Sequence, residues 1–293
     1  MIDRVQFLTK WLNITRIRQW HKNGFVLLGF FALGDYGNHA LFLDAVVVAL
    51  AFCFASSATY IFNDFLDVEA DREHPLKKKR PLAAGTIKTG WAIAVSILLA
   101  LAALVTASRI SDLSAFFVAA YLLNNLLYSL LLKNRSIIDV FQIALGFMLR
   151  LLAGTVAVGI QISDWMTLTG FLVSLLIGFS KRYSELSNHS NSLKARKVLK
   201  KYSVEALRIF IAITAAATIM TYALYTLSPS TIEMRGHSHL MYTVPIVIFG
   251  VFRFLHIILH NRGGEDPASL LFRDQQLLAA VIMWITVFAL MVR

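Results

Sequence analysis

Nine stretches of the 293-residue sequence are apolar and long enough to cross a lipid bilayer. An α-helix rises about 1.5 Å per residue, so about 20 apolar residues span a hydrocarbon core of about 30 Å. Backbone groups inside lipid must bond within their own segment, and we therefore expect helices. The predicted spans lie near residues 23–34, 41–65, 89–108, 113–132, 136–159, 164–179, 203–227, 240–259 and 277–292. The first and sixth are short, so eight spans remain an alternative.

The composition agrees with an all-α integral membrane protein. Hydrophobic residues make up 57% of the chain and charged residues 15%, and the mean hydropathy is +0.65, unlike an ordinary soluble domain. Residues 1–22 are too polar for the core of a signal peptide, and we expect them to be retained as an amphipathic segment. One transmembrane domain is predicted for residues 23–293. The single cysteine, Cys53, excludes an intrachain disulfide and a cysteine-rich metal site.

Basic residues are concentrated in alternate connections between the predicted spans. Lys and Arg number five in residues 1–22, six in 66–88, two in 132–136, seven in 180–202 and two in 260–276. The opposite connections and the C-terminus carry only Arg109, Arg235 and Arg293. The positive-inside rule then predicts a cytoplasmic N-terminus and an external C-terminus. We expect the protein to lie in the inner (plasma) membrane. A net charge of +11 on one side suits anionic headgroups or phosphorylated substrates, and nucleic acid is not an expected partner.

Four polar side chains follow the apolar part of the second predicted span: Asn63, Asp64, Asp67 and Asp71. At about 100° per residue they fall on one helical face, which they share with Tyr60. Ionisable groups at membrane depth are usually functional, and Mg²⁺ typically takes one or two carboxylates together with substrate phosphates. We therefore predict a magnesium–diphosphate site with these four residues as metal ligands and the three aspartates as catalytic residues. The alternative is a set of solvated charges where a helix leaves the membrane.

Two basic clusters follow predicted spans on the cytoplasmic side. The first runs from Arg72 to Arg80, and its cations can neutralise phosphate oxygens. The second contains Lys181, Arg182 and Glu185 after the sixth span, and predicts phosphate binding without a metal. Charge that only sets membrane topology is the alternative for both clusters.

A charged pair lies within the fifth predicted span. Asp139 and Arg150 are eleven residues apart, close to three helical turns, so they share one face. Arg150 falls at membrane depth, where a charge needs a partner or a polar cavity. A structural ion pair to another helix and a role in substrate binding both remain open for it.

The pattern Asn-Asp-x-x-Asp-x-x-x-Asp over residues 63–71, in a nine-span helical protein, resembles the UbiA superfamily of intramembrane prenyltransferases. Further motifs resemble its decaprenyl-phosphate phosphoribosyltransferase branch over nearly the whole chain. These motifs are Arg16-x-x-Gln-Trp-x-Lys-Asn23, Asp71-Arg-Glu-His-Pro-x-Lys-x-x-Arg-Pro81, Tyr128-x4-Lys133-x5-Asp139 and Lys181-Arg-Tyr-x-Glu185. The resemblance implies about nine helices around a cavity that faces the cytoplasm.

The same resemblance implies a reaction. Members of this branch transfer 5-phosphoribose from phosphoribosyl pyrophosphate to a polyprenyl phosphate such as decaprenyl phosphate and release pyrophosphate, with Mg²⁺ as cofactor. The polyprenylphosphoryl-5-phosphoribose product is a precursor of cell-envelope sugar donors. The lipid bilayer is the other expected partner, and the oligomeric state is left open, a homo-oligomer included.

The charge pattern and the resemblance together give a set of candidate substrate-binding residues. They are Lys22, Tyr60, Arg72, Lys77, Arg80, Tyr128, Lys133, Lys181, Arg182 and Glu185.

One departure from the wider family bears on the choice of reaction. Prenyl-transferring relatives carry a second Asp-rich motif after the sixth span, where this chain has Lys181-Arg182-Tyr183-Ser184-Glu185. The basic cluster argues against prenyl transfer to an aromatic or other small acceptor, which is kept as the first alternative. A membrane transporter is the second alternative, and it predicts broken helices near the midplane.

Overall fold

The computed structural model describes residues 10–33, 37–73, 75, 77–188, 197–235, 239–260, 267 and 270–292. Every regular element within these residues is a helix, so the predicted all-α fold is confirmed. The chain divides into two compact units that are described separately. Unit 1 takes in residues 1–30, 37–132 and 149–160, and unit 2 takes in 31–36, 133–148 and 161–293. The single domain over residues 23–293 stays a prediction, and residues 1–9 of the amphipathic segment lie outside the described residues.

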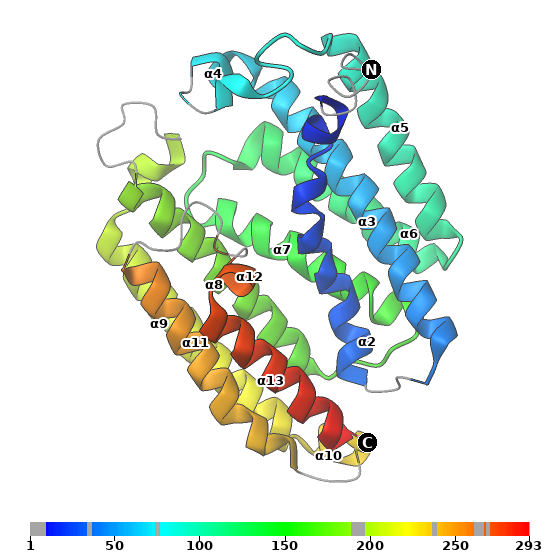
Figure 1. Cartoon of the computed structure of the whole chain (residues 1–293), viewed down its shortest axis with the longest axis vertical. Helices are drawn as coiled ribbons and strands as arrows, with labels where there is room; N and C mark the ends of the chain where they lie inside the picture. Colours follow the sequence, from blue (N-terminus) through cyan, green and yellow to red (C-terminus); the bar gives the residue numbers. More distant parts are fainter. Residues whose placement is uncertain are drawn as a thin grey trace. The chain divides into compact units, whose positions relative to one another are not determined.

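Unit 1 is built around the long helix α3, with α5, α6 and the N-terminal segment packed beside it (Figure 1). Its elements are η1 (Ile17–Leu27, a 3₁₀ helix), the start of α2 (Leu28–Leu33), α3 (His39–Leu66), α4 (Val68–Glu73), η2 (Lys77–Lys79), α5 (Thr89–Ser108), α6 (Asp112–Leu127), η3 (Tyr128–Leu132, a π-helical turn), the end of α7 and η4 (Val156–Val158). Side-chain caps define two starts: Asn38 accepts from Leu41 N at 3.1 Å, and Ser111 accepts from Ser114 N at 3.0 Å.

Unit 2 is also helical. Its helix α8 packs against α9, and α11 packs against both α9 and α13 (Figure 1). Its elements are most of α7 (Ile138–Ala153), α8 (Asp164–Asn188), η5 (Lys197–Lys201), α9 (Val204–Leu227), α10 (Pro229–Arg235), η6 (His239–Thr243), α11 (Val244–Leu259), α12 (Leu270–Arg273) and α13 (Gln275–Val292). Ser203 caps α9 by accepting from Ala206 N at 3.0 Å.

Each of the nine predicted stretches contains a helix, although the stretch 136–159 also has turns at 136–137, 154–155 and 159, and the helix in 203–227 begins at Val204. Six helical segments are long and apolar enough to cross a membrane by length and composition: His39–Leu66, Thr89–Ser108, Asp112–Leu132, Ile138–Val158, Val204–Leu227 and His239–Leu259. The chain is therefore a multi-pass membrane protein. The count of nine spans and a cavity facing the cytoplasm stay predictions.

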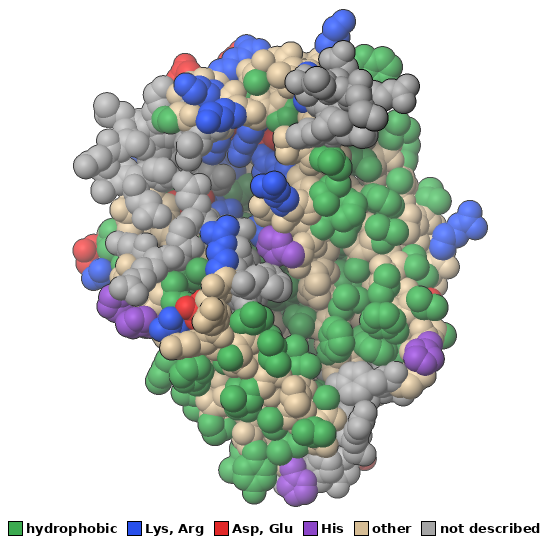
Figure 2. All heavy atoms as spheres, in the orientation of Figure 1, with side chains coloured by type: hydrophobic (Ala, Val, Ile, Leu, Met, Phe, Trp, Pro, Cys, Tyr) green, Lys and Arg blue, Asp and Glu red, His purple; other side chains and the backbone are tan. Residues whose placement is uncertain are grey.

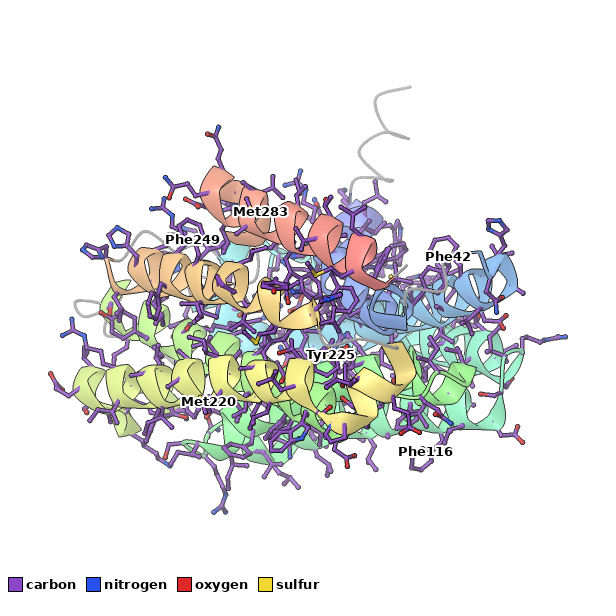
Figure 3. The ribbon with its side chains drawn as sticks, turned by 90° about the horizontal axis from the view of Figure 1, so that it is seen from below. Phe42, Phe116, Met220, Tyr225, Phe249 and Met283 are labelled. Carbon is purple, nitrogen blue, oxygen red and sulfur yellow. The ribbon has the colours of Figure 1, made fainter. Side chains whose placement is uncertain are left out.

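Large apolar side chains point outward from the helices of each unit, as expected for surfaces that meet lipid. Met220, Phe249 and Met283 are exposed on α9, α11 and α13 of unit 2, whereas Tyr225 of the same unit is buried (Figure 3). Figure 2 shows hydrophobic side chains along the visible parts of α3 in unit 1 and of α13 in unit 2.

Small residues allow α3 and α5 to approach closely in the core of unit 1. Ala51, Ala55, Ala103 and Ala107 are fully buried there and pack with larger residues such as Phe52. Close packing of small residues is a main source of helix association in membranes, because lipid tails are as apolar as the side chains. The core of unit 2 instead uses larger aliphatic and aromatic side chains on α8, α9 and α11.

Gly154 at the end of α7 provides a test of packing in unit 1. A Cβ atom built at Gly154 would lie 1.8 Å from the carbonyl oxygen of Val26, a backbone atom of η1 that cannot rotate away. We expect Gly154→Ala to destabilise the protein by about 1–3 kcal/mol, the usual cost of overpacking. Thermal unfolding of the purified protein in detergent measures the effect.

Gly90 near the start of α5 is the matched control, because nothing lies within 4 Å of a Cβ built there. Gly90→Ala should leave the unfolding temperature unchanged or raise it, since Ala is the better helix former. Equal unfolding temperatures for the two variants would contradict the close contact between η1 and α7.

Candidate functional site

The four predicted metal ligands lie where α3 ends in unit 1. Their spacing predicts one helical face, but α3 ends at Leu66 and α4 begins at Val68. Asp67 lies between them with φ −98° and ψ 9°. Two backbone bonds bridge the break: Asp67 N donates to Asn63 O at 3.0 Å, and Asp71 N donates to Asp67 O at 2.8 Å. The predicted spacing is therefore kept although the helix is interrupted.

Two of the aspartates are buried and share cationic partners. Asp64 and Asp71 are 3% and 4% exposed. Arg80 Nη1 donates to Asp64 Oδ1 at 3.0 Å and to Asp71 Oδ2 at 2.6 Å, and Arg16 Nη2 donates to the same Asp64 oxygen. A buried carboxylate needs such partners because it has lost its hydration. The sequence analysis assigned Arg80 to the site, but it did not assign Arg16.

The other two predicted ligands form a second pair beside the first. Asn63 Nδ2 donates to Asp67 Oδ2 at 3.1 Å, and both side chains are half-buried. Ser129 Oγ donates to Asn63 Oδ1 at 3.2 Å from the π-helical turn η3. Ser129 was not predicted, and the nearest signal was its neighbour Tyr128. Turns of this kind are frequent at functional sites.

The remaining predicted residues of unit 1 are spread over several elements. Lys22 lies in η1, Lys77 in η2 and Tyr128 at the start of η3, and all three are half-buried. Arg72 on α4 is exposed, and its Nε donates to Ala83 O at 3.4 Å. Basic side chains of this unit gather around α4 on the face shown in Figure 2. His74 lies outside the described residues.

The basic cluster after the sixth span lies in unit 2 and contains a buried ion-pair network. Arg182 and Asp139 are both fully buried, and Arg182 Nε donates to Asp139 Oδ2 at 2.6 Å. Arg182 Nη1 donates to Glu185 Oε2 at 2.5 Å. Arg182 thereby joins α8, which also carries Glu185, to α7, which carries Asp139. Asp139 on α7 is therefore ion-paired to Arg182 on another helix, α8, and not to Arg150 on its own helix. The roles of Arg182 and Glu185 in phosphate binding stay predictions.

Tyr202 joins this network to the loop that precedes α7. Its hydroxyl donates to Asp139 Oδ1 at 2.7 Å and accepts from Ile137 N at 2.5 Å. Burial, together with the bond to the Asp139 carboxylate, raises the pKa of Tyr202 above its ordinary value, so the hydroxyl keeps its proton. Ile137 has a φ of 69°, which is unusual for a β-branched residue and indicates a loop fixed by its neighbours. Half-buried Lys133 lies at the start of this loop.

Arg150 has its own polar neighbours in unit 1. Its side chain is buried, Nε donates to Asn23 Oδ1 at 2.7 Å, and Nη2 donates to the Tyr121 hydroxyl at 2.9 Å. The guanidinium carbon also lies 4.4 Å from the centroid of the Tyr121 ring. Asn23 in turn donates to Cys53 Sγ at 3.2 Å and to Ser56 Oγ at 3.3 Å. Arg150 thereby ties η1 to α3 and α6.

Comparison with known proteins identifies the family. The model of the UbiA prenyltransferase family matches residues 24–291. The chain belongs to this family of membrane transferases, which confirms the predicted resemblance and the prediction of a transferase. It is 33% identical over 281 residues to the decaprenyl-phosphate phosphoribosyltransferase of Corynebacterium glutamicum, with 94% of this chain and 84% of that protein covered. It is 32% identical over 285 residues to the enzyme of the same name from Mycolicibacterium smegmatis, with 94% and 89% covered.

Solved structures share the fold at lower identity. A UbiA homologue from Archaeoglobus fulgidus bound to DMAPP and Mg²⁺ has a TM-score of 0.74, 20% identity, and coverage of 97% of this chain and 98% of that chain. A UbiA homologue from Aeropyrum pernix has a TM-score of 0.67 and 15% identity, with 91% and 97% covered. These similarities agree with the helical membrane fold.

The buried network of unit 2 leads to a stability prediction. Asp139→Asn leaves Arg182 with only part of its counter-charge in a site closed to water, so we expect a loss of about 3 kcal/mol or more. Thermal unfolding in detergent measures it. Asp274→Asn is the control, because the Asp274–Arg253 pair is 19% and 26% exposed and is screened by solvent.

The control variant also keeps its local structure, since Asn at 274 can still accept from Leu277 N at the start of α13. Arg253 holds the pKa of Asp274 near 2, so this pair is charged at neutral pH and the comparison is between two ion pairs. A larger loss for Asp274→Asn than for Asp139→Asn would contradict the structural role of the buried pair.

Proposed function

We propose that the protein transfers 5-phosphoribose from phosphoribosyl pyrophosphate to decaprenyl phosphate or a similar polyprenyl phosphate, with release of pyrophosphate. One observation supports this above all: relatives named decaprenyl-phosphate phosphoribosyltransferase align with 94% of the chain at 33% and 32% identity. The polar residues at the end of α3 are the types that such a reaction needs. The active site is proposed to open on the cytoplasmic side of the inner membrane, the side to which the basic connections are assigned.

The side-chain oxygens at the end of α3 fit a magnesium ion that is shared with a diphosphate. Among the described residues, no three His, Cys, Asp or Glu side chains converge as a ready metal cage. Mg²⁺ in phosphate-transferring enzymes usually takes only one or two carboxylates and completes its shell with water and substrate oxygens. The Asn63–Asp67 pair supplies two oxygen-bearing side chains in one place. We propose Asn63 and Asp67 as ligands, with Asp64 and Asp71 as further ligands or hydrogen-bond partners.

Magnesium bound there would neutralise charge on the pyrophosphate leaving group. The chain's own residues then have separate tasks. Tyr60, Lys22, Lys77, Arg72 and Arg80 would bind diphosphate oxygens. Tyr128, Lys133 and Lys181 are proposed for the ribose 5-phosphate or for the incoming polyprenyl phosphate. Arg182 and Glu185, which are ion-paired with each other, are proposed to hold Lys181 in position for that phosphate.

The bond changes follow from the two substrates. An oxygen of the polyprenyl phosphate forms a bond to C1 of the ribose, while the bond from C1 to the pyrophosphate oxygen breaks and its electron pair leaves with pyrophosphate. The attacking phosphate is already an anion at neutral pH, so a strong general base is unnecessary. Direct displacement inverts C1 from α in the donor to β in the product. Positive side chains stabilise the charge that develops on the leaving group.

Asp67→Ala tests the metal assignment. We expect it to lower phosphoribosyl transfer by about a hundredfold or more, because the variant removes a carboxylate that acts on the transition state. The assay follows label from phosphoribosyl pyrophosphate into the lipid phase with polyprenyl phosphate and Mg²⁺, and is repeated with EDTA. Asp112→Ala is the control, since Asp112 is exposed at the start of α6. Full activity of Asp67→Ala would refute the assignment.

The same assay separates the proposed reaction from its alternatives. Magnesium-dependent labelling of lipid supports phosphoribosyl transfer. Consumption of a prenyl diphosphate with an aromatic acceptor, without lipid labelling, would favour prenyl transfer. Inactivity in both assays would favour transport.

Lys181→Ala tests the basic cluster of unit 2 better than a change at Arg182. Arg182→Ala would leave Asp139 and Glu185 buried without their cation and would damage the fold itself. Lys181 is only half-buried, so Lys181→Ala should keep the unfolding temperature near that of the wild type. We expect its KM for one of the two phosphorylated substrates to rise by about tenfold, the loss of one charge-assisted hydrogen bond. Unchanged KM values would contradict phosphate binding by Lys181 and favour the alternative that its charge only sets the membrane topology.

A further inference from the structure

Arg16 lies among the proposed site residues of unit 1, although its sequence position gave it no assigned role. Its Nη2 donates to Asp64 Oδ1, and its guanidinium carbon lies 4.8 Å from the centroid of the Tyr60 ring. The side chain is 23% exposed, so it is partly open to solvent. The Arg16 guanidinium therefore contacts both Asp64, a proposed metal ligand, and Tyr60, which is proposed to bind the diphosphate.

The backbone fixes the direction of this side chain. Arg16 has φ 51° and ψ 45°, a left-handed conformation that residues with a Cβ atom rarely adopt and that persists where neighbours impose it. Residues on both sides of Arg16 are tied to Ser57 of α3 by hydrogen bonds. Trp20 Nε1 donates to Ser57 Oγ at 3.0 Å, and Ser57 Oγ donates to Thr15 O at 2.7 Å. The segment around Arg16 is thus held against α3 (Figure 1). The bond from Arg16 to Asp64 places the guanidinium at the end of that helix.

The hydrogen-bond partners of Asp64 are expected to change when a divalent cation or a diphosphate binds beside it. Asp64 Oδ1 accepts from Arg16 and from Arg80. A divalent cation at Asp64 places two more positive charges beside these guanidiniums, and like charges repel, with partial screening because both guanidiniums are about a quarter exposed. A diphosphate reverses the balance, because its oxygens are better partners for a guanidinium than one shared carboxylate oxygen. Arg16 therefore opposes the metal alone and favours the metal together with diphosphate.

We infer that Arg16 is a donor-binding residue that exchanges Asp64 for the diphosphate when metal and diphosphate bind together. This inference rests on the proposed function and adds a residue that couples the two binding events. It requires weak binding of the metal by itself and tight binding of pyrophosphate with the metal. A residue that only supports the fold would strengthen both kinds of binding.

Two titrations of the full-length protein in detergent test this coupling. The first measures Mn²⁺ alone, from the electron paramagnetic resonance signal of the free ion. The second measures pyrophosphate in the presence of Mg²⁺ by calorimetry. For Arg16→Gln we expect Mn²⁺ affinity to rise by about threefold, because a competing cation has gone. Pyrophosphate affinity should fall by about tenfold or more, because a charged hydrogen-bond donor has gone.

Arg18→Gln is the matched control, since Arg18 is exposed in the same segment and the change removes the same charge. It should leave both affinities unchanged. Arg16→Lys is a second variant that keeps the charge, in case Arg16→Gln fails to fold. It should keep the Mn²⁺ affinity of the wild type but bind pyrophosphate more weakly, because an ammonium group lacks the two parallel donors of a guanidinium.

Several results would overturn the inference. They are a fall of both affinities in Arg16→Gln, no change in either, or wild-type pyrophosphate affinity in Arg16→Lys. The proposed function can fail separately. If the wild type binds neither Mn²⁺ nor pyrophosphate, the site at the end of α3 is wrong, and the inference falls with it. If the wild type binds both and Arg16→Gln behaves like Arg18→Gln, only the inference is wrong.

Discussion

A charge buried away from water needs an opposite charge or several hydrogen bonds, and this requirement organises the polar interior of both units. Asp64 and Asp71 in unit 1 form ion pairs with Arg80, and Asp139 in unit 2 forms an ion pair with Arg182. Arg150 meets the same need with an amide, a hydroxyl and an aromatic ring. The contacts of Arg182 and Arg150 join helices that are far apart in the sequence, so satisfying these charges also fixes how the helices of each unit pack.

The two units meet this requirement in ways that suit different tasks. The cations around Asp64 are each about a quarter exposed, and water or a ligand can reach them. Arg182 is fully closed in and is bonded on two sides. Partners that solvent can reach can be exchanged at modest cost, whereas a fully buried pair resists separation. The end of α3 is thus the adaptable part of the polar interior, and the Arg182 network is the fixed part.

Hydropathy was sufficient to predict the helices, because a lipid-exposed segment has few ways to satisfy its backbone. The spacing of Asn63 to Asp71 was also predicted, although the break at Asp67 was not, since no Gly or Pro marks it. Partners across the fold were beyond the reach of periodicity. Arg16 is 48 residues from Asp64, and Arg182 is 43 residues from Asp139. Charge type alone indicated phosphate binding for Arg182, and only the fold shows that Asp139 is ion-paired to it.

The end of α3 at Leu66 has an electrostatic consequence of its own. A helix of 28 residues ends at this point, and the carbonyl groups of its last turn carry a partial negative charge. It is smaller than the roughly half charge of an open helix end, because Asp67 N bonds to the Asn63 carbonyl and α4 begins at Val68. This partial charge comes from the backbone, so no side-chain substitution removes it. The polypeptide backbone therefore contributes to the attraction of cations here, and the side chains of Asp64 and Asp67 add to a potential that the course of the main chain has already established.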